Sequence, residues 1–151
     1  MIEMKYTLII DELKEESIVV TAHKKNKLIF EIENLIKNDS FKLIGYKDEK
    51  SFPLNILDVY AFYTYDGKVY AKTKSEDYLV RERIYKIEEY TQALFVKINQ
   101  GCLVNVKMIL RFDSNIGGSI KVTLKNNFSD YISRRELKNV KRRIGLWRNM
   151  H

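Results

Sequence analysis

The fold of this chain is decided by residues 94–145, which have the sequence LFVKINQGCLVNVKMILRFDSNIGGSIKVTLKNNFSDYISRRELKNVKRRIG. An apolar run at residues 95–98 is separated from a second one at 102–104 by a small polar loop, Asn99-Gln100-Gly101. Two more apolar runs, at residues 109–113 and 119–124, flank a turn-forming segment that contains Gly117-Gly118. Short apolar runs between turn residues are typical of antiparallel strands. We therefore expect an α+β fold that consists mostly of antiparallel strands, with short helices.

A basic C-terminal helix is predicted to follow these strands. Ser133 and Glu136 have the spacing of a capping box, in which each side chain accepts a hydrogen bond from the backbone N–H of the other residue. Leu137, Val140 and Ile144 recur at helical spacing and can bury one face of the helix. The basic residues on the rest of the helix surface have two interpretations. A helix start that carries arginines is suited to phosphate binding, and a charged helix face is also common as plain solvated surface.

The residues before this stretch add further strands and a short helix. Residues 54–64 and 69–74 are β-prone and flank Asp66-Gly67, a dipeptide suited to a two-residue hairpin turn. A short strand is expected at residues 78–80 and a short helix at residues 81–90. Pro53 is the single proline, and it cannot lie in a central strand because it has no N–H. We predict a division of the chain at about residue 52.

An N-terminal extension over residues 1–52 is predicted to have the order β-β-α-β. Residues 5–10 and 17–22 are rich in β-branched side chains, which favours strands. Apolar residues at helical spacing predict a helix over 24–38, and residues 41–47 predict a third strand. No residue pattern here indicates a catalytic or metal site. We expect this extension either to pack on the rest of the protein or to contact another protein.

The net charge of +7 is concentrated in the last third of the chain. Residues 101–151 carry 11 Lys and Arg against 3 Asp and Glu, whereas residues 1–50 carry 9 against 10. Such an asymmetry favours a polyanion as the partner of the C-terminal part. An anionic membrane surface is a weaker alternative, because the basic helix has a narrow apolar stripe.

The sequence favours a cytoplasmic protein without catalytic activity. It has one cysteine, no apolar run of about 18 residues, and no N-terminal pattern of a signal peptide. Two histidines, His23 and His151, and the single Cys102 do not make a usual zinc site. Cys102 lies within an apolar run, which favours a buried hydrophobic role over a nucleophilic one. We predict no enzyme activity and no cofactor.

Taken together, several of these segments resemble the LytTR family of bacterial DNA-binding domains. The matching segments are FVKINQGCLVN at 95–105, the strands of 109–122, YISRR at 131–135, and ILDVYAF and DGKVY at 56–62 and 66–70. The resemblance implies that residues 53–151 form a LytTR-type DNA-binding domain. The short chain is similar to stand-alone regulators of this family, which resemble response regulators but lack a phosphoacceptor receiver domain.

The resemblance implies sequence-specific binding of double-stranded DNA, with loops that enter successive major grooves and two copies, a homodimer, on paired repeats. Arginine can pair with guanine, and Asn or Gln with adenine. Base contacts are expected from Lys68, Asn99, Gln100 and Arg135. Phosphate contacts are expected from Lys97, Arg134, Lys138, Lys141 and Arg142. The family commonly has His-Arg/Asn-Ser where this chain has Asn99-Gln100-Gly101, so either Asn99 or Gln100 could face DNA. Control by a membrane protein partner is also implied.

Two other classes of protein stay open. The first is a protein-interaction module in which residues 1–50 bind a protein and the basic helix binds acidic surfaces in general. The second is an RNA-binding adapter in which strand tyrosines such as Tyr63 and Tyr70 stack on unpaired bases. Cross-strand packing is the more common role for such tyrosines.

Overall fold

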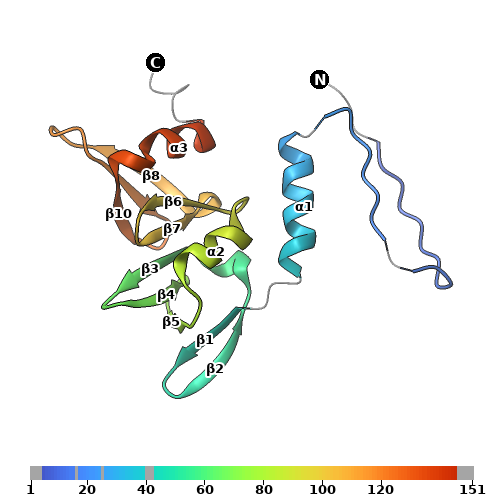
Figure 1. Cartoon of the computed structure of the whole chain (residues 1–151), viewed down its shortest axis with the longest axis horizontal. Helices are drawn as coiled ribbons and strands as arrows, with labels where there is room; N and C mark the ends of the chain where they lie inside the picture. Colours follow the sequence, from blue (N-terminus) through green and yellow to red (C-terminus); the bar gives the residue numbers. More distant parts are fainter. Residues whose placement is uncertain (1–4, 16, 25, 40–42, 146–151) are drawn as a thin grey trace.

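The computed structural model describes residues 5–15, 17–24, 26–39 and 43–145. Within these ranges the protein has three α-helices, two short 3-10 helices and ten β-strands, and every strand pairing is antiparallel (Figure 1). The predicted α+β class, with antiparallel strands in the majority, is confirmed.

The larger sheet has seven strands in the order β2-β1-β5-β4-β3-β7-β6. Their bounds are β1 Leu43–Lys47, β2 Lys50–Leu54, β3 Ala61–Tyr65, β4 Lys68–Lys72, β5 Asp77–Val80, β6 Phe95–Asn99 and β7 Cys102–Asn105. The predicted Asp66-Gly67 turn joins β3 to β4. Both turn residues have positive φ angles, 50° and 72°, as a two-residue hairpin of this type requires. Pro53 lies in β2 at the margin of the sheet, which is where a strand tolerates a residue without an N–H.

The smaller sheet has three strands in the order β10-β9-β8. Their bounds are β8 Ile109–Ser114, β9 Ile120–Leu124 and β10 Ser129–Ile132. The remaining elements are α1 Lys27–Asp39, η1 Ile56–Asp58, α2 Ile84–Thr91, η2 Val106–Met108 and α3 Arg134–Ile144. Asn105 caps η2, because its side-chain oxygen accepts a hydrogen bond from Lys107 N at 3.0 Å.

Two hydrophobic cores lie on opposite faces of the larger sheet, because successive side chains of a strand point to opposite faces. One core contains Phe62, Phe95 and Leu103 together with Ile87 of α2. The other contains Ala61, Val96 and Val104 together with Val122 of β9 and Val140 of α3. Strands β3, β6 and β7 are therefore buried on both faces and form the rigid centre of the molecule.

Helix α3 is fixed along β6, the last strand of the larger sheet. Leu137, Val140 and Ile144 belong to the second core, as their spacing predicts. At the start of the helix, Ser133 N donates to Ile98 O at 2.8 Å. Near its end, the Arg143 Nη1 atom donates to Phe95 O at 2.9 Å. Two backbone carbonyls of β6 thus hold both ends of α3.

The predicted capping box at Ser133 is wrong, although Ser133 is the N-cap residue of α3. Its side chain makes no capping hydrogen bond. Its carbonyl oxygen instead accepts from Glu136 N at 3.1 Å and from Leu137 N at 3.0 Å. A reciprocal capping box also needs the Ser133 N–H for the Glu136 carboxylate, and that N–H already donates to Ile98 O. At the other end, Gly145 closes the helix with a φ of 69°.

The two predicted N-terminal strands are wrong. Residues 5–10 and 17–22 are assigned to no strand, and their side chains face solvent; Ile9 is 80% exposed and Val19 is 85% exposed. A β-prone sequence forms a strand when it finds a neighbouring strand and a surface to cover, and neither is provided for these residues within the described chain. The predicted helix is confirmed as α1, and the strand that follows it is confirmed as β1.

The predicted division at residue 52 falls inside β2. Strand β1 pairs with β2 on one side and with β5 on the other, where Gly45 lies opposite Val80. A side chain at Gly45 would meet the Tyr78 Cβ atom at 2.7 Å, so glycine allows this close approach. Residues on both sides of the predicted boundary therefore build one sheet, and a division into two domains stays a prediction.

Candidate nucleic-acid interface

Three chain connections lie together at one end of the larger sheet. They are the β3–β4 turn at residues 65–68, the β6–β7 loop at residues 100–101 and the β10–α3 junction at residues 132–135, and we call this end the loop edge. Thr64 N donates to Gly101 O at 2.8 Å, which places the first two connections side by side. The bond from Ser133 N to Ile98 O places the start of α3 next to the end of β6. In Figure 1 the β3–β4 turn and the start of α3 lie on the same side of the molecule.

Asn99 fastens the middle loop to the neighbouring sheet. Its Nδ2 atom donates to Asp130 Oδ2 and to Tyr131 O, each at 3.0 Å. Its Oδ1 atom accepts from Gly101 N, also at 3.0 Å. The amide thus has partners at both ends inside the protein, and its hydrogen bonds tie the loop to β10.

Gln100, Lys68 and Arg135 are exposed at the loop edge. Each comes from a different connection, and each connection is anchored by the backbone bonds described above. A glutamine and two long cations on neighbouring rigid supports are suited to hydrogen bonding with base edges and phosphates. The structure therefore brings three of the four predicted base-contact residues to one exposed edge, and it leaves the amide of Asn99 bonded within the protein.

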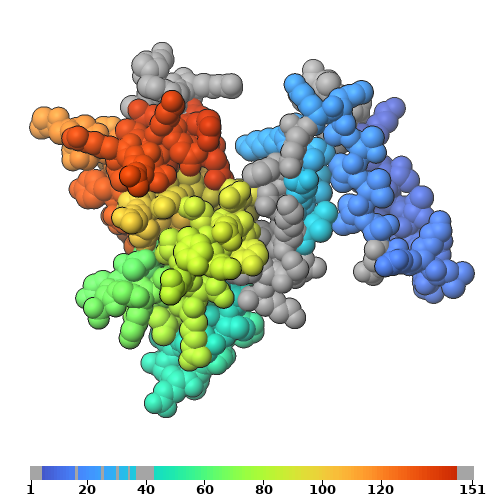
Figure 2. Space-filling model, viewed as in Figure 1, coloured from blue at the N-terminus to red at the C-terminus, as the bar shows by residue number. Residues whose placement is uncertain are grey.

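The outer face of α3 carries most of the predicted phosphate contacts. Arg134, Lys138 and Arg142 are exposed, and their spacing of four residues places them on one face of the helix. Like charges at this spacing disfavour a helix by a few tenths of a kcal/mol per pair, and an anion bound along the face would relieve this repulsion. Figure 2 shows α3, in red, on the surface of the molecule. Lys141 is half-buried on the same helix.

Lys97, the remaining predicted phosphate contact, lies in a different setting. It is half-buried on β6 and lines a hollow between α2 and α3 with Glu88, Glu136 and Arg143 among its neighbours. Two glutamates thus line the same hollow as this cation. Arg143 was not predicted as a site residue, and its bond to Phe95 O gives it a structural role. Its partial burial lowers the pKa of its guanidinium from the ordinary value.

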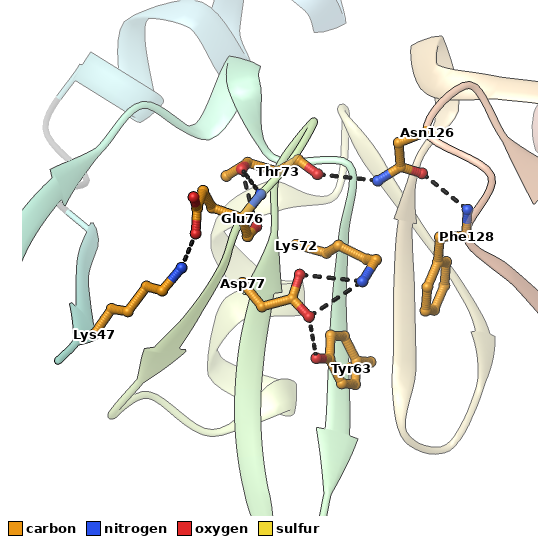
Figure 3. A network of polar contacts seen from close by, with 8 residues as sticks. All are labelled: Lys47, Tyr63, Lys72, Thr73, Glu76, Asp77, Asn126 and Phe128. Atoms are coloured by element: carbon orange, nitrogen blue, oxygen red, sulfur yellow. Dashed lines mark hydrogen bonds and ion pairs between the residues drawn. The ribbon is translucent and has the colours of Figure 1, made fainter.

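The tyrosines proposed as stacking platforms are engaged within the protein. Tyr63 stacks on Tyr70 with ring centroids 5.4 Å apart, and its hydroxyl donates to Asp77 Oδ2 at 2.7 Å. Burial, followed by the bond to Asp77, raises the pKa of Tyr63 above its ordinary value. Lys72 completes the group through two 3.1 Å bonds to Asp77 (Figure 3). These contacts support the packing interpretation over base stacking.

The same region joins the two sheets. Asn126, in the turn between β9 and β10, donates from Nδ2 to Thr73 O at 3.0 Å and accepts from Phe128 N at 3.1 Å (Figure 3). Lys72 Nζ also lies 5.6 Å from the ring centroid of Phe128. The two sheets whose connections form the loop edge are therefore joined to each other by these contacts.

The described residues contain no group of three or more His, Cys, Asp or Glu side chains placed to hold a metal ion. Cys102 is 1% exposed, and burial raises the pKa of its thiol well above the ordinary value, which disfavours the thiolate. No helix in the described part of the chain is long and apolar enough to cross a membrane.

One feature of the site could not be predicted from the sequence. Asp130 and the carbonyl of Tyr131 fix Asn99 although they lie about thirty positions further along the chain. No local pattern marks such a pairing. The sequence shows that residues 128–132 are β-prone and that the middle loop is polar. Neither feature gives the order of strands that brings these two segments together.

An antiparallel β module with exposed cations and an amide along one edge is suited to binding a polyanion. A sequence model of the LytTr DNA-binding domain matches residues 49–145 of this chain. The chain belongs to the LytTR family, whose defining domain binds DNA. Family membership thus supports DNA binding and transcription regulation.

Individual relatives agree with this assignment. Two proteins described as HTH-type transcriptional regulators, from Staphylococcus aureus strains MSSA476 and MW2, are each 30% identical over 146 residues, covering 95% of this chain and 99% of the relative. A solved LytTr DNA-binding domain of a Bacillus cereus protein has a TM-score of 0.63 at 14% identity and covers 70% of this chain and 99% of the solved chain. This last likeness concerns the fold.

Proposed function

We propose that the protein is a cytoplasmic transcription regulator that binds double-stranded DNA in a sequence-specific way through its loop edge. The observation that carries this proposal is the meeting of three separately anchored connections, bearing Lys68, Gln100 and Arg135, at one exposed edge. Strands separate each α-helix from the next within the described residues. The proposed mode of recognition therefore uses loops and not a helix-turn-helix.

Each group of residues has a proposed role. Arg135, Gln100 and Lys68 contact base edges, and Asn99 positions the middle loop through Asp130 and Tyr131. The contacts to phosphates come from Lys97, Arg134, Lys138, Lys141 and Arg142. The exposed face with Arg134, Lys138 and Arg142 supports this role most directly, because it lies open to solvent next to the loop edge.

The proposed complex contains two copies of the protein on a pair of repeats. One copy presents a single loop edge, which spans a short DNA element. Two copies joined in a dimer double the length of the recognised sequence and bind far more tightly than one copy alone. Control by a membrane protein is a further prediction that comes from the family resemblance alone.

The first experiment is selection of bound DNA from a random duplex pool in the presence of a single-stranded competitor. We expect the selected pool to converge on a repeated short element, because Arg135 and Gln100 distinguish bases by hydrogen bonding. A pool that stays random, or a preference for the single strand, would contradict the proposal.

Arg135→Ala then tests the proposed base contact. We expect a loss of about 1–3 kcal/mol on the selected element and a smaller loss on random DNA, measured by fluorescence polarisation. Lys107→Ala is the matched control, because Lys107 is an exposed cation in η2, at the opposite end of β7 from the middle loop. Equal losses on both DNAs would make Arg135 a phosphate contact.

A further inference from the structure

The N-terminal part of the chain exposes an unusual amount of apolar surface. We call residues 5–15 and 17–24 the N-terminal arm. Seven of its large apolar side chains are at least 70% exposed, namely Tyr6, Leu8, Ile9, Ile10, Leu13, Ile18 and Val19. Helix α1 adds Leu28, Leu35 and Ile36, which are 42–57% exposed. Scattered apolar residues on a surface are ordinary, whereas many exposed large apolar side chains concentrated in one segment indicate an interaction site.

The arm has the composition of strands that are covered on both faces. Leu8, Ile9 and Ile10 are consecutive, as are Ile18, Val19 and Val20, so apolar side chains point to both sides of each extended stretch. Polar residues would alternate with them in a strand that was solvated on one face. Neither stretch belongs to a sheet. Among the described residues, the arm therefore has neither a neighbouring strand nor a cover for its faces.

The larger sheet of the same chain is not suited to supply a neighbouring strand for the arm. One of its margins is β2, where Pro53 has no N–H to donate to an added strand. The other margin is β6, along which α3 is held by Ser133 and Arg143.

The chemistry of the arm also disfavours DNA and acidic membranes as partners. Residues 1–50 carry 9 Lys and Arg against 10 Asp and Glu, so this part of the chain has no basic excess to attract a polyanion. An apolar, nearly neutral surface with unpaired extended backbone is suited to a partner of the same character. A second copy of the arm has this character by construction.

We propose that the N-terminal arm, together with the exposed face of α1, is the surface through which two copies of this protein form a dimer without DNA. An antiparallel pairing of extended segments across a two-fold axis lets the same surface serve both copies, and it adds backbone hydrogen bonds to the apolar contact. A standard interface buries about 800 Å² of surface on each partner. The largest exposed apolar patch of an ordinary monomer, roughly 300–600 Å², is too small to supply this area alone. The ten exposed large apolar side chains of the arm and α1 would contribute to the buried surface.

The test compares the full chain with the double variant Ile9→Lys/Val19→Lys in analytical ultracentrifugation, with no DNA present. Both side chains are at least 80% exposed in the single chain, so the lysines should leave its circular dichroism and thermal unfolding unchanged. We expect the native protein to sediment at twice the chain mass and to dissociate on dilution. The double variant should sediment at the chain mass. Amide hydrogen exchange at residues 5–10 and 17–22 should be slow in the native protein and fast in the variant.

Leu57→Lys is the matched control, because Leu57 is an exposed leucine in η1 outside the arm and α1, and this variant should remain dimeric. A native protein that is monomeric at every concentration would overturn the proposal, whether its arm amides exchange quickly or are protected by folding back on the chain. A double variant that stays dimeric would also overturn it. The measurement involves no DNA, so its failure leaves the proposed DNA contacts untouched, and a dimer that selects no DNA element would count against the proposed function alone.

Discussion

At the scale of single residues, Asn99 and Gln100 are neighbours with different surroundings. The Asn99 amide is bonded at both ends, to Asp130 and Tyr131 on one side and to Gly101 on the other. The Gln100 side chain is exposed. The sequence could not decide which of the two faces DNA. The structure gives a physical reason to separate the two residues. If the Asn99 amide turned away to contact DNA, the half-buried Asp130 carboxylate and Gly101 N–H would lose their partner.

We predict that Asn99→Ala lowers both stability and DNA affinity while leaving the preferred DNA element unchanged. Loss of the three hydrogen bonds leaves the Asp130 carboxylate and the Gly101 N–H without this partner, which should cost about 1–3 kcal/mol in the free energy of unfolding. Urea unfolding measures the stability, and repeated selection from the random pool measures the preference. Gln100→Ala serves for comparison, since it should relax the preference at one base position without loss of stability. A relaxed preference in Asn99→Ala would make Asn99 a direct base contact.

At the scale of elements, the features that the sequence predicted are those with local causes. The Asp66-Gly67 turn, the β8–β9 hairpin, α1, α2 and the apolar face of α3 follow from turn chemistry and periodicity within a few residues. Elements that depend on distant partners were not predictable in this way. The stretches at 5–10 and 17–22 have strand composition without a neighbouring strand. The Ser133 N–H, needed for the expected capping box, bonds to Ile98, 35 positions earlier in the chain.

The two ends of α3 should respond differently to alanine. Ser133→Ala removes a hydroxyl that makes no capping bond, so we expect a change of less than about 0.5 kcal/mol in the free energy of unfolding. Gly145→Ala places a side chain at a φ of 69°, which should cost about 1–2 kcal/mol. Apart from its own backbone and its two chain neighbours, a Cβ atom there would meet no described atom within 4 Å. The cost therefore comes from the local backbone conformation and not from packing against other elements.

Urea unfolding of both variants at equal protein concentration checks this pair of predictions. A loss of about 1 kcal/mol or more in Ser133→Ala would mean that the hydroxyl caps α3 in solution.

At the scale of the whole molecule, the charge asymmetry predicts how DNA binding responds to salt. Each phosphate neutralised by a lysine or arginine releases counterions, so the logarithm of the binding constant falls with the logarithm of salt concentration. We predict that Lys138→Ala and Arg142→Ala each reduce the magnitude of this slope by about 1, and do so equally on the selected element and on random DNA. Titrations at a series of salt concentrations measure the slope.

Lys107→Ala should leave the slope unchanged, because its exposed cation lies at the far end of β7 from the loop edge. Slopes that are unaffected in the two α3 variants would remove that helix face from the proposed contact with phosphates.

The closure of the larger sheet at both margins has a consequence for how the protein behaves in a crowded solution. Open sheet margins are templates on which further chains can add without limit, the route to fibres. Here α3 occupies one margin through Ser133 and Arg143, and Pro53 interrupts the pattern of donors at the other. The sheet therefore has a fixed width. The proposed self-association is confined to an arm outside this sheet, so it can end at a closed pair without adding strands to the larger sheet.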